Sequence, residues 1–347
     1  MRGVVFLGDR ELEIRDFPDP APGPGEVVLR IRASGMCGSD LNFYRIRGYA
    51  AKLGLGGDGS PVIAGHEPCG EVVAVGPGVS EKEARIGQRA MDHHYYGCGV
   101  CGQCRSGWAQ MCEDGSIVYG VTGHGAHADY MTVPARTLVP LPDGLSFATG
   151  AAIACGTGTA YGALRRLEIS GRDTIAIFGQ GPVGLSATQL AAAMGARVIA
   201  LDMSPDRRAL ALRMGADAAI DPGADDPVAA LRDLTGGGPD LAMDCSGNPD
   251  ARAAAVQAAR RWGKVCFVGE GGEVAINVSR DMLRKQLTVM GSWTFSTVGQ
   301  ADCARFVAER GIDVDALFTH TYRSLDEADA AYRLFDTQTT GKGVFLL

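Results

Sequence analysis

Four cysteines stand close together within the run GCGVCGQCRSGWAQMC. Cys98, Cys101 and Cys104 are separated by two residues each, and Cys112 follows after seven more. Four thiolates at this spacing can surround one tetrahedral ion at metal–sulfur distances of about 2.3 Å, and Zn²⁺ is the ion that most favours such a site. The run therefore predicts a structural zinc lobe; disulfides, scattered buried thiols or an iron–sulfur cluster are the alternatives. A four-cysteine site is closed, so metal chemistry has to lie elsewhere.

Three further residues with metal-binding side chains occur in separate parts of the chain. Cys37 lies in GMCGSD, His66 lies in GHE, and Cys155 ends the segment GAAIAC. A cysteine, a histidine and a second cysteine brought together from separate elements would form an open zinc site, whose fourth position takes water or an alcohol. Spacing along the chain does not by itself show that the three meet.

A glycine-rich segment, GQGPVG at 179–184, follows the apolar run TIAIF and opens the helix-like stretch PVGLSATQLAAAMG. Gly179 would allow a tight turn, Gly181 would let the backbone approach a pyrophosphate, and Gly184 would let helix and strand pack closely. Pro182 and Val183 would begin the helix, whose N-terminus attracts phosphate. The segment predicts a dinucleotide site, and a plain glycine turn is the alternative.

The next apolar run, RVIALD, ends in Asp202, 18 residues beyond Gly184. A carboxylate at this position can accept hydrogen bonds from the adenosine ribose and would repel a 2′-phosphate. The sequence therefore favours NAD over NADP as the cofactor. Arg207 and Arg208, a few residues further on, could soften that preference.

The elements that carry these residues change character along the chain. Up to about residue 150 the sequence is strand-like, with runs such as EVVLRIRAS and GEVVAVG separated by turn signals. From 155 to 293, apolar runs of strand length alternate with Ala-rich helical segments, which is typical of a doubly wound α/β domain with a parallel sheet. A tail of two helices and two strands is expected to return to the first domain. We thus expect domains at 1–154, with the lobe at about 95–113, at 155–293, and a returning segment at 294–347.

Composition limits the classes of function. The 347-residue chain has a net charge of −7 and a pI near 5.4, which oppose a general nucleic-acid or membrane-surface role. No stretch approaches the ~20 apolar residues of a spanning helix, and the N-terminus lacks the features of a signal peptide. Ten cysteines in such a chain are expected to be thiols and metal ligands in a reducing compartment, so we expect a cytoplasmic protein.

The motifs GMCGSD, GHE, the four-cysteine lobe, ACGTGTAYGAL and GQGPVG occur here in the order found in one known family. At these motifs, and nearly end to end, the chain resembles the zinc-containing medium-chain alcohol and polyol dehydrogenases, especially the sorbitol and threonine dehydrogenase branch. The resemblance implies a GroES-like β-rich catalytic domain, a Rossmann NAD-binding domain and an active site in the cleft between them. It also implies one catalytic and one structural Zn²⁺ per chain, and a homodimer or homotetramer.

The resemblance also implies roles for single residues. Cys37, His66 and Cys155 match the catalytic zinc ligands, and Glu67 matches a carboxylate that can approach or replace a ligand. Asp40 matches the group that orients His66, as metal-bound imidazoles generally require. The remaining matches are Ser39 as the hydroxyl that takes the alcohol's proton, Thr159 near the nicotinamide, and Val268 and Gly269 beside the carboxamide.

One position departs from the family's pattern. Many members have a proton-relaying histidine where this chain has Asn42, and an amide cannot titrate near neutral pH. Proton exit would then use water or another group such as His94, which is a candidate for a relay or a substrate-pocket residue and otherwise an ordinary histidine. His124 and His127, in GHGAHADY, are more typical of a structural turn.

The expected reaction is the interconversion of a small alcohol, by preference a secondary alcohol on a polar or polyol-like molecule, with its ketone or aldehyde. Zn²⁺ would act as a Lewis acid and NAD would take the hydride. Two other classes stay open: a zinc-free quinone or enone reductase of the same fold, and a non-enzymatic dinucleotide-binding redox sensor. A count of two zinc ions per chain would separate the dehydrogenase from the zinc-free reductase.

Overall fold

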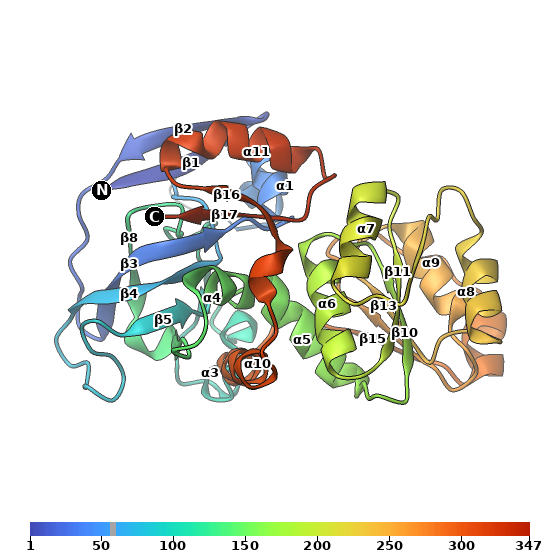
Figure 1. Cartoon of the computed structure of the whole chain (residues 1–347). Helices are drawn as coiled ribbons and strands as arrows, with labels where there is room; N and C mark the ends of the chain where they lie inside the picture. Colours follow the sequence, from blue (N-terminus) through green and yellow to red (C-terminus); the bar gives the residue numbers. More distant parts are fainter. Residues whose placement is uncertain (56–59) are drawn as a thin grey trace. The chain divides into compact units, whose positions relative to one another are not determined.

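The computed structural model describes residues 1–55 and 60–347 and divides into two compact units (Figure 1). Unit 1 comprises Met1–Gly158, Phe295–Gln338 and Lys342–Leu347. Unit 2 comprises Thr159–Thr294 and the short segment Thr339–Gly341. Each unit is built around its own large sheet, and the chain leaves unit 1 for the long segment 159–294 and again briefly at 339–341.

Unit 1 contains a seven-stranded sheet in the order β16-β17-β3-β4-β5-β9, with β8 also paired to β3. An antiparallel pair, β1 and β2, forms a separate small sheet. The strands of unit 1 are β1 (Arg2–Gly8), β2 (Glu11–Asp16), β3 (Glu26–Gly35), β4 (Pro68–Val75), β5 (Arg89–Asp92), β6 (Tyr95–Tyr96), β7 (Ile117–Val118), β8 (Tyr130–Pro134), β9 (Leu138–Pro140), β16 (Phe318–Tyr322) and β17 (Lys342–Leu346). This confirms the β-rich character expected of the first region.

Strand β3 is the centre of the unit 1 sheet because it pairs with β4, β8 and β17. Leu29 and Ile31 belong to one apolar cluster, together with Val72 of β4 and Met131 of β8. A second cluster, around Tyr332, includes residues from β1, from the loop after β3 and from the C-terminal helix. Strand β17 pairs antiparallel with the end of β3, so the last residues of the chain lie beside the loop that carries Cys37.

The helices of unit 1 are short and are placed by local caps. Ser146 accepts a hydrogen bond from the backbone N–H of Thr149 at the start of α4, and a Ser324–Glu327 capping box precedes α11. The helices of this unit are α1 (Asp40–Arg45), α2 (Tyr49–Lys52), α3 (Gly102–Arg105), α4 (Phe147–Ile153), α10 (Thr297–Arg310) and α11 (Ala328–Asp336), and α5 (Gly156–Leu167) runs from this unit into unit 2.

Unit 2 contains a six-stranded, all-parallel sheet in the order β12-β11-β10-β13-β14-β15. The strands are β10 (Thr174–Phe178), β11 (Arg197–Leu201), β12 (Ala218–Ile220), β13 (Leu241–Asp244), β14 (Lys264–Phe267) and β15 (Thr288–Gly291). The strand order reverses at β10, as in doubly wound dinucleotide-binding domains. The expected α/β class is therefore confirmed, with β15 as an additional edge strand that the apolar runs did not indicate.

The helices of unit 2 connect the parallel strands and cover both faces of the sheet. Figure 1 shows α6 and α7 on one side of the sheet and α8 and α9 on the other. Each begins with a proline, which suits the first helical position because its missing N–H is not needed there. The helices are α6 (Pro182–Ala193), α7 (Pro205–Arg213), α8 (Pro227–Thr235) and α9 (Pro249–Ala258). In the described part of the chain, no helix has the length and apolar character needed to cross a membrane.

Candidate metal and cofactor sites

Three loops of unit 1 bring four metal-binding side chains together. Cys37 follows the end of β3, His66 and Glu67 come directly before β4, and Cys155 follows α4. The two strands are antiparallel and Ser34 pairs with Pro68, so the end of β3 and the start of β4 lie at the same edge of the sheet. Helix α4 packs against β3, which carries Cys155 to this edge. The ligand atoms of these four buried residues all lie within 4.8 Å of one another.

The geometry of this cluster fits a tetrahedral metal ion. Two sulfur atoms bound to one ion at about 2.3 Å with a tetrahedral angle would be about 3.8 Å apart. The Sγ atoms of Cys37 and Cys155 are 3.8 Å apart. The imidazole of His66 and the carboxylate of Glu67 complete a mixed sulfur, nitrogen and oxygen donor set that suits Zn²⁺. The structure thus brings together the three ligands and the carboxylate that the sequence indicated.

The electrostatics of the cluster favour deprotonated sulfur beside a positive charge. Hydrogen bonding from Cys155 lowers the pKa of Cys37 well below its ordinary value, and His66 adds to this effect. Hydrogen bonding to Cys37 and burial raise the pKa of Cys155 well above its ordinary value. Burial opposes the charged form of His66, but Asp40 and Cys37 raise its pKa overall. Binding of a metal cation would displace the protons of His66 and Cys155.

Asp40 and Ser39, for which the resemblance implied roles beside the zinc ligands, both contact the cluster. Asp40 Oδ1 lies 2.9 Å from His66 Nδ1, and its Oδ2 accepts a hydrogen bond of 2.9 Å from the backbone N–H of Cys37. Because His66 uses Nδ1 for this contact, its Nε2 is left to face the metal-binding atoms. The Ser39 hydroxyl, which is half-buried, lies 3.3 Å from both Cys37 Sγ and His66 Nε2.

Glu67 has a partner that sequence reasoning missed. Lys342, at the start of β17, donates a hydrogen bond of 2.7 Å to Glu67 Oε1 and lies 2.5 Å from Oε2. It also donates to the backbone oxygen of Met36 at 3.1 Å. Burial raises the pKa of Glu67, and the ammonium of Lys342 counteracts part of that rise. Gly35 leaves room for the carboxylate, because a Cβ there would lie 1.9 Å from Glu67 Oε2.

His94 lies beside the cluster and is fully buried. Its Nδ1 is 2.7 Å from the backbone oxygen of Ala154, the residue before Cys155. Its ring centre is 5.3 Å from that of His66 and 5.9 Å from that of Phe295. An Nδ1–H donor to a carbonyl leaves Nε2 as a hydrogen-bond acceptor. His94 is therefore a neighbour of the metal-binding group, in a position to contact a molecule bound there.

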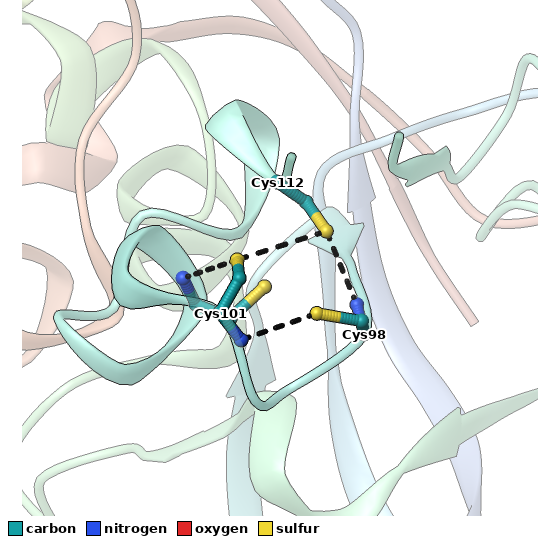
Figure 2. A group of neighbouring side chains, drawn as sticks. Cys98, Cys101 and Cys112 are labelled. Atoms are coloured by element: carbon teal, nitrogen blue, oxygen red, sulfur yellow. Dashed lines mark hydrogen bonds between the residues drawn. The ribbon is translucent and has the colours of Figure 1, made fainter. Parts of the chain in front are cut away.

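The four-cysteine run forms a separate cluster between β6 and β7. The ligand sulfurs of Cys98, Cys101, Cys104 and Cys112 lie within 4.8 Å of one another, and those of Cys101 and Cys112 are 4.0 Å apart. Figure 2 shows the backbone N–H groups that point at these sulfurs, with distances of 3.3 Å for Cys98 to Cys112 and for Cys101 to Cys98. Such N–H contacts stabilise thiolates.

The packing of this lobe is as tight as a small metal site requires. A Cβ on Gly97 would lie 2.8 Å from the sulfurs of both Cys104 and Cys112. All ten cysteines are free thiols, so the disulfide alternative for the run is not found. The lobe can hold one tetrahedral ion, and its four sulfur ligands leave no position for a substrate.

The glycine segment of unit 2 has the backbone geometry of a phosphate-binding turn. Gly179 has a φ of +86°, and a Cβ there would lie 2.8 Å from the Cβ of Ser246. A Cβ on Gly184 would lie 1.8 Å from the oxygen of Gly179, so this glycine allows α6 to approach β10. Gly181, by contrast, faces open space apart from Arg207 at 4.0 Å. The first N–H groups of α6 are therefore accessible to a phosphate.

Asp202 follows β11 and is held beside the glycine segment. Its Oδ2 accepts a hydrogen bond of 2.7 Å from the backbone N–H of Gln180, and its Oδ1 accepts one of 2.8 Å from that of Ser204. Arg208 forms an ion pair of 3.0 Å with Asp221. Arg207 donates through Nε to the oxygen of Thr340 at 2.9 Å. The carboxylate is thus fixed at the end of its strand, with lone pairs left for a ribose.

The other expected cofactor residues also lie in unit 2. Val268 and Gly269 follow β14, and their N–H groups donate to the backbone oxygen of Asp244 at 2.9 and 3.0 Å. The buried carboxylate of Asp244 accepts hydrogen bonds from Ser246 and from Arg252. Sequence reasoning missed Asp244 and Arg252; the only signal was a charged residue ending the apolar run LAMD. Thr159 is a buried residue of α5.

Comparisons with known proteins identify the family of the chain. Residues 23–143 match the alcohol dehydrogenase GroES-like domain, and residues 182–309 match the zinc-binding dehydrogenase domain. The uncharacterized zinc-type alcohol dehydrogenase-like protein YphC of Escherichia coli is 37% identical, over 99% of this chain and 98% of its own length. The L-threonine 3-dehydrogenase of Pyrococcus abyssi is 34% identical, over 96% of this chain and 95% of its own length.

A solved structure of a zinc-binding dehydrogenase is also similar to this chain. A putative zinc-binding dehydrogenase from Sinorhizobium meliloti, bound to NADP, is 28% identical and has a TM-score of 0.86 over 100% of this chain and 99% of that one. The two domain matches and the full-length relatives show the family. The chain belongs to the zinc-type medium-chain alcohol dehydrogenases and is a zinc-dependent, NAD(P)-linked alcohol oxidoreductase, with a GroES-like domain and a Rossmann-like domain.

Proposed function

We propose that this enzyme interconverts a secondary alcohol on a small polar molecule and the corresponding ketone, with NAD as the preferred hydride acceptor. The observation that carries the proposal is the buried group of Cys37, His66 and Cys155, whose donor atoms fit one open zinc site. The similarity to a threonine 3-dehydrogenase supports a secondary hydroxyl with a polar neighbour as the reacting group.

In this proposal Cys37, His66 and Cys155 hold the catalytic zinc, and the four-cysteine lobe holds a structural one. A zinc ion bound there supplies a Lewis acid that makes the alcohol more acidic. Ser39 takes the alcohol's proton, since its hydroxyl lies at the edge of the ligand cluster. Asp40 keeps the Nδ1–H of His66 occupied, which fixes the ring orientation and tautomer.

We place His94 in the substrate pocket. Its hydrogen bond to the oxygen of Ala154 fixes the ring, and the free Nε2 can accept a hydrogen bond from a second hydroxyl of the substrate. A polar second group on the substrate would use this acceptor. Asn42 cannot carry a proton, so water has to complete the path from Ser39 to solvent.

The cofactor residues are assigned by their place at the ends of the parallel strands. Gly179, Gly181 and Gly184 admit the pyrophosphate, with Pro182 and Val183 at the start of α6. Asp202 accepts hydrogen bonds from the ribose and disfavours a 2′-phosphate, with Arg207 beside it. The nicotinamide end is assigned to Thr159, Val268 and Gly269.

The assembly and location are also part of the proposal. The edge strand β15 is half-exposed and ends a six-stranded sheet, so a second copy could extend the sheet there, in a homodimer or homotetramer. The ten free thiols fit a reducing compartment, which favours the cytoplasm.

The test combines metal content with kinetics. Cys37→Ala and His66→Ala should each reduce the zinc content from two ions per chain to one and lower kcat by at least about 10³-fold, because the Lewis acid is lost. NADH binding should persist, since its residues belong to unit 2. Cys69→Ala is the matched control: it removes a fully buried thiol of the same unit that lies outside the cluster. Near-normal kcat in either ligand variant would refute the assignment.

A further inference from the structure

A continuous line of hydrogen bonds leads from the proposed zinc site into the core of unit 1. Asp40, which contacts His66 through Oδ1, accepts a hydrogen bond of 3.2 Å on Oδ2 from the hydroxyl of Tyr332. That hydroxyl lies 2.6 Å from His127 Nε2. His127 Nδ1 lies in turn 2.7 Å from the hydroxyl of Ser34. The five side chains come from α1, α11, β3 and two loops that are remote in sequence.

Burial leaves these groups few other partners. Ser34, His127 and Tyr332 are fully buried, and Asp40 is 3% exposed. A buried polar group without a partner costs about 1–3 kcal/mol, so the members satisfy one another or destabilise the fold. Burial lowers the pKa of His127 to about 4 and raises the pKa of Tyr332 well above its ordinary value. Both are therefore neutral near pH 7.

One arrangement of protons lets every donor in this line find an acceptor. Ser34 donates to His127 Nδ1, His127 donates through Nε2–H to the oxygen of Tyr332, and Tyr332 donates to Asp40. Asp40, as a carboxylate, accepts from Tyr332, from His66 Nδ1 and from the N–H of Cys37. The lone pair of His66 Nε2 then stays free for the metal.

We propose that Tyr332, oriented by His127, is a positioning residue of the catalytic zinc site. Its hydroxyl holds the carboxylate of Asp40 at the angle that keeps His66 aimed at the metal. The ring of His127 also packs directly against Gly65, the residue before His66. A Cβ on Gly65 would lie only 2.5 Å from His127 Nδ1. The inference rests on the proposed function, since it takes Cys37, His66 and Cys155 as the zinc ligands.

A neighbouring tyrosine separates this role from simple packing. Tyr44 belongs to the same apolar cluster as Tyr332, is 1% exposed, and has its ring centre 5.5 Å from that of Tyr332. Its buried hydroxyl makes no hydrogen bond within the described residues. Removal of either hydroxyl keeps an aromatic ring in the cluster, but only the hydroxyl of Tyr332 reaches Asp40.

The experiment measures zinc release from the purified two-zinc enzyme into excess chromogenic chelator. Mutation of groups that orient metal ligands typically costs about 10–100-fold in metal affinity, and Tyr332 acts one group further away, so we expect Tyr332→Phe to release one of the two zinc ions about tenfold faster. The lobe zinc is the internal reference and should be released at the wild-type rate. Tyr44→Phe, the matched control, should release both ions within about twofold of wild type.

The outcomes distinguish failure of the positioning role of Tyr332 from failure of the proposed function. If Tyr332→Phe and Tyr44→Phe release zinc alike, the positioning role is wrong while the proposed function stands. If Cys37→Ala leaves the zinc content of the enzyme unchanged, the proposed function fails and the inference with it. Should Tyr332→Phe not fold, Ser34→Ala keeps all rings and removes the last donor of the line. It should accelerate the same release by roughly threefold, and an unchanged rate would overturn the role.

Discussion

Replacement of Lys342 by methionine tests the buried charge pair that Lys342 forms with Glu67 in unit 1. Lys342 is 1% exposed and Glu67 is fully buried, and their charged groups are in direct contact. Methionine keeps an unbranched side chain of similar length, so the packing of the stem is largely retained. The substitution removes the ammonium and leaves the carboxylate buried without its cation.

The expected cost follows from the loss of the cation beside Glu67. Burial raises the pKa of Glu67 to about 8 even with the ammonium of Lys342 in contact, so the carboxyl is harder still to ionise without it. Removal of one partner of a buried pair typically costs roughly 3–5 kcal/mol. For a unit of about 200 residues, a loss of ~3 kcal/mol lowers Tm by about 6–12 °C.

The loss should depend little on pH below neutrality. Burial keeps the pKa of Glu67 above its unfolded value in wild type, and loss of the ammonium raises it further, so both folded proteins bind the proton below about pH 7. The deficit relative to wild type should therefore be similar at pH 7.0 and 5.5. Glu67→Gln in the Lys342→Met background keeps a neutral side chain at this position and should leave the stability close to that of Lys342→Met.

Differential scanning calorimetry of the zinc-loaded variants at pH 7.0 and 5.5 measures these differences. Lys264→Met is the matched control, because it also breaks a lysine–glutamate contact but the partner, Glu168, is 78% exposed. Its Tm should hardly change, since an exposed pair contributes little. A Tm of Lys342→Met close to that of wild type, or a deficit that grows at low pH, would show that the reasoning about this pair is wrong.

Three further predictions concern other parts of the molecule. Cys101→Ser should lower Tm by roughly 5–10 °C while kcat at low temperature stays near wild type, because the lobe supports the fold and holds no substrate; lost catalysis with intact Tm would contradict this. Asp202→Ala should lower the ratio of kcat/KM for NAD over that for NADP by at least about tenfold, and an unchanged ratio would refute the role of the carboxylate. Burial lowers the pKa of His93 to about 4, so stability from its neutral form is complete above about pH 6.5 and is lost as the pH falls toward 4. His93→Gln should flatten the decline of Tm between pH 6.5 and 5, and an equally steep decline would exclude His93 as its cause.

Much of the fold could be predicted because its signals are local. The runs TIAIF and RVIAL coincide with β10 and β11, since strands buried on both faces of a parallel sheet are apolar throughout. Strand β15, Thr288–Gly291, carries no such signal because it is a short, half-exposed edge strand. Its assignment depends on pairing with β14, which sequence periodicity does not report.

The candidate site likewise has residues that local motifs indicate and partners that no local motif indicates. Cys37, His66 and Cys155 stand in short motifs of small and polar residues, and these motifs could be interpreted one at a time. Lys342 lies 275 residues from Glu67 along the chain, and no local pattern marks it. His127, expected in a structural turn, lies in a bend and forms a buried link between Ser34 and Tyr332. These partners are brought together only by the return of the C-terminal segment to unit 1.

This difference in sequence distance has a physical consequence for the two metal sites. In the lobe, the thiolates receive hydrogen bonds from the N–H groups of Cys98, Cys101 and Cys104, so fifteen consecutive residues supply both the ligands and their stabilisation. In the cluster of Cys37, His66, Glu67 and Cys155, the carboxylate of Glu67 is paired with Lys342 of β17. Asp40, which contacts His66, accepts a hydrogen bond from the hydroxyl of Tyr332 in α11. The ligands and N–H donors of the lobe are therefore contiguous in sequence, whereas Glu67 and Asp40 also use partners from the last part of the chain, whose final strand pairs with β3.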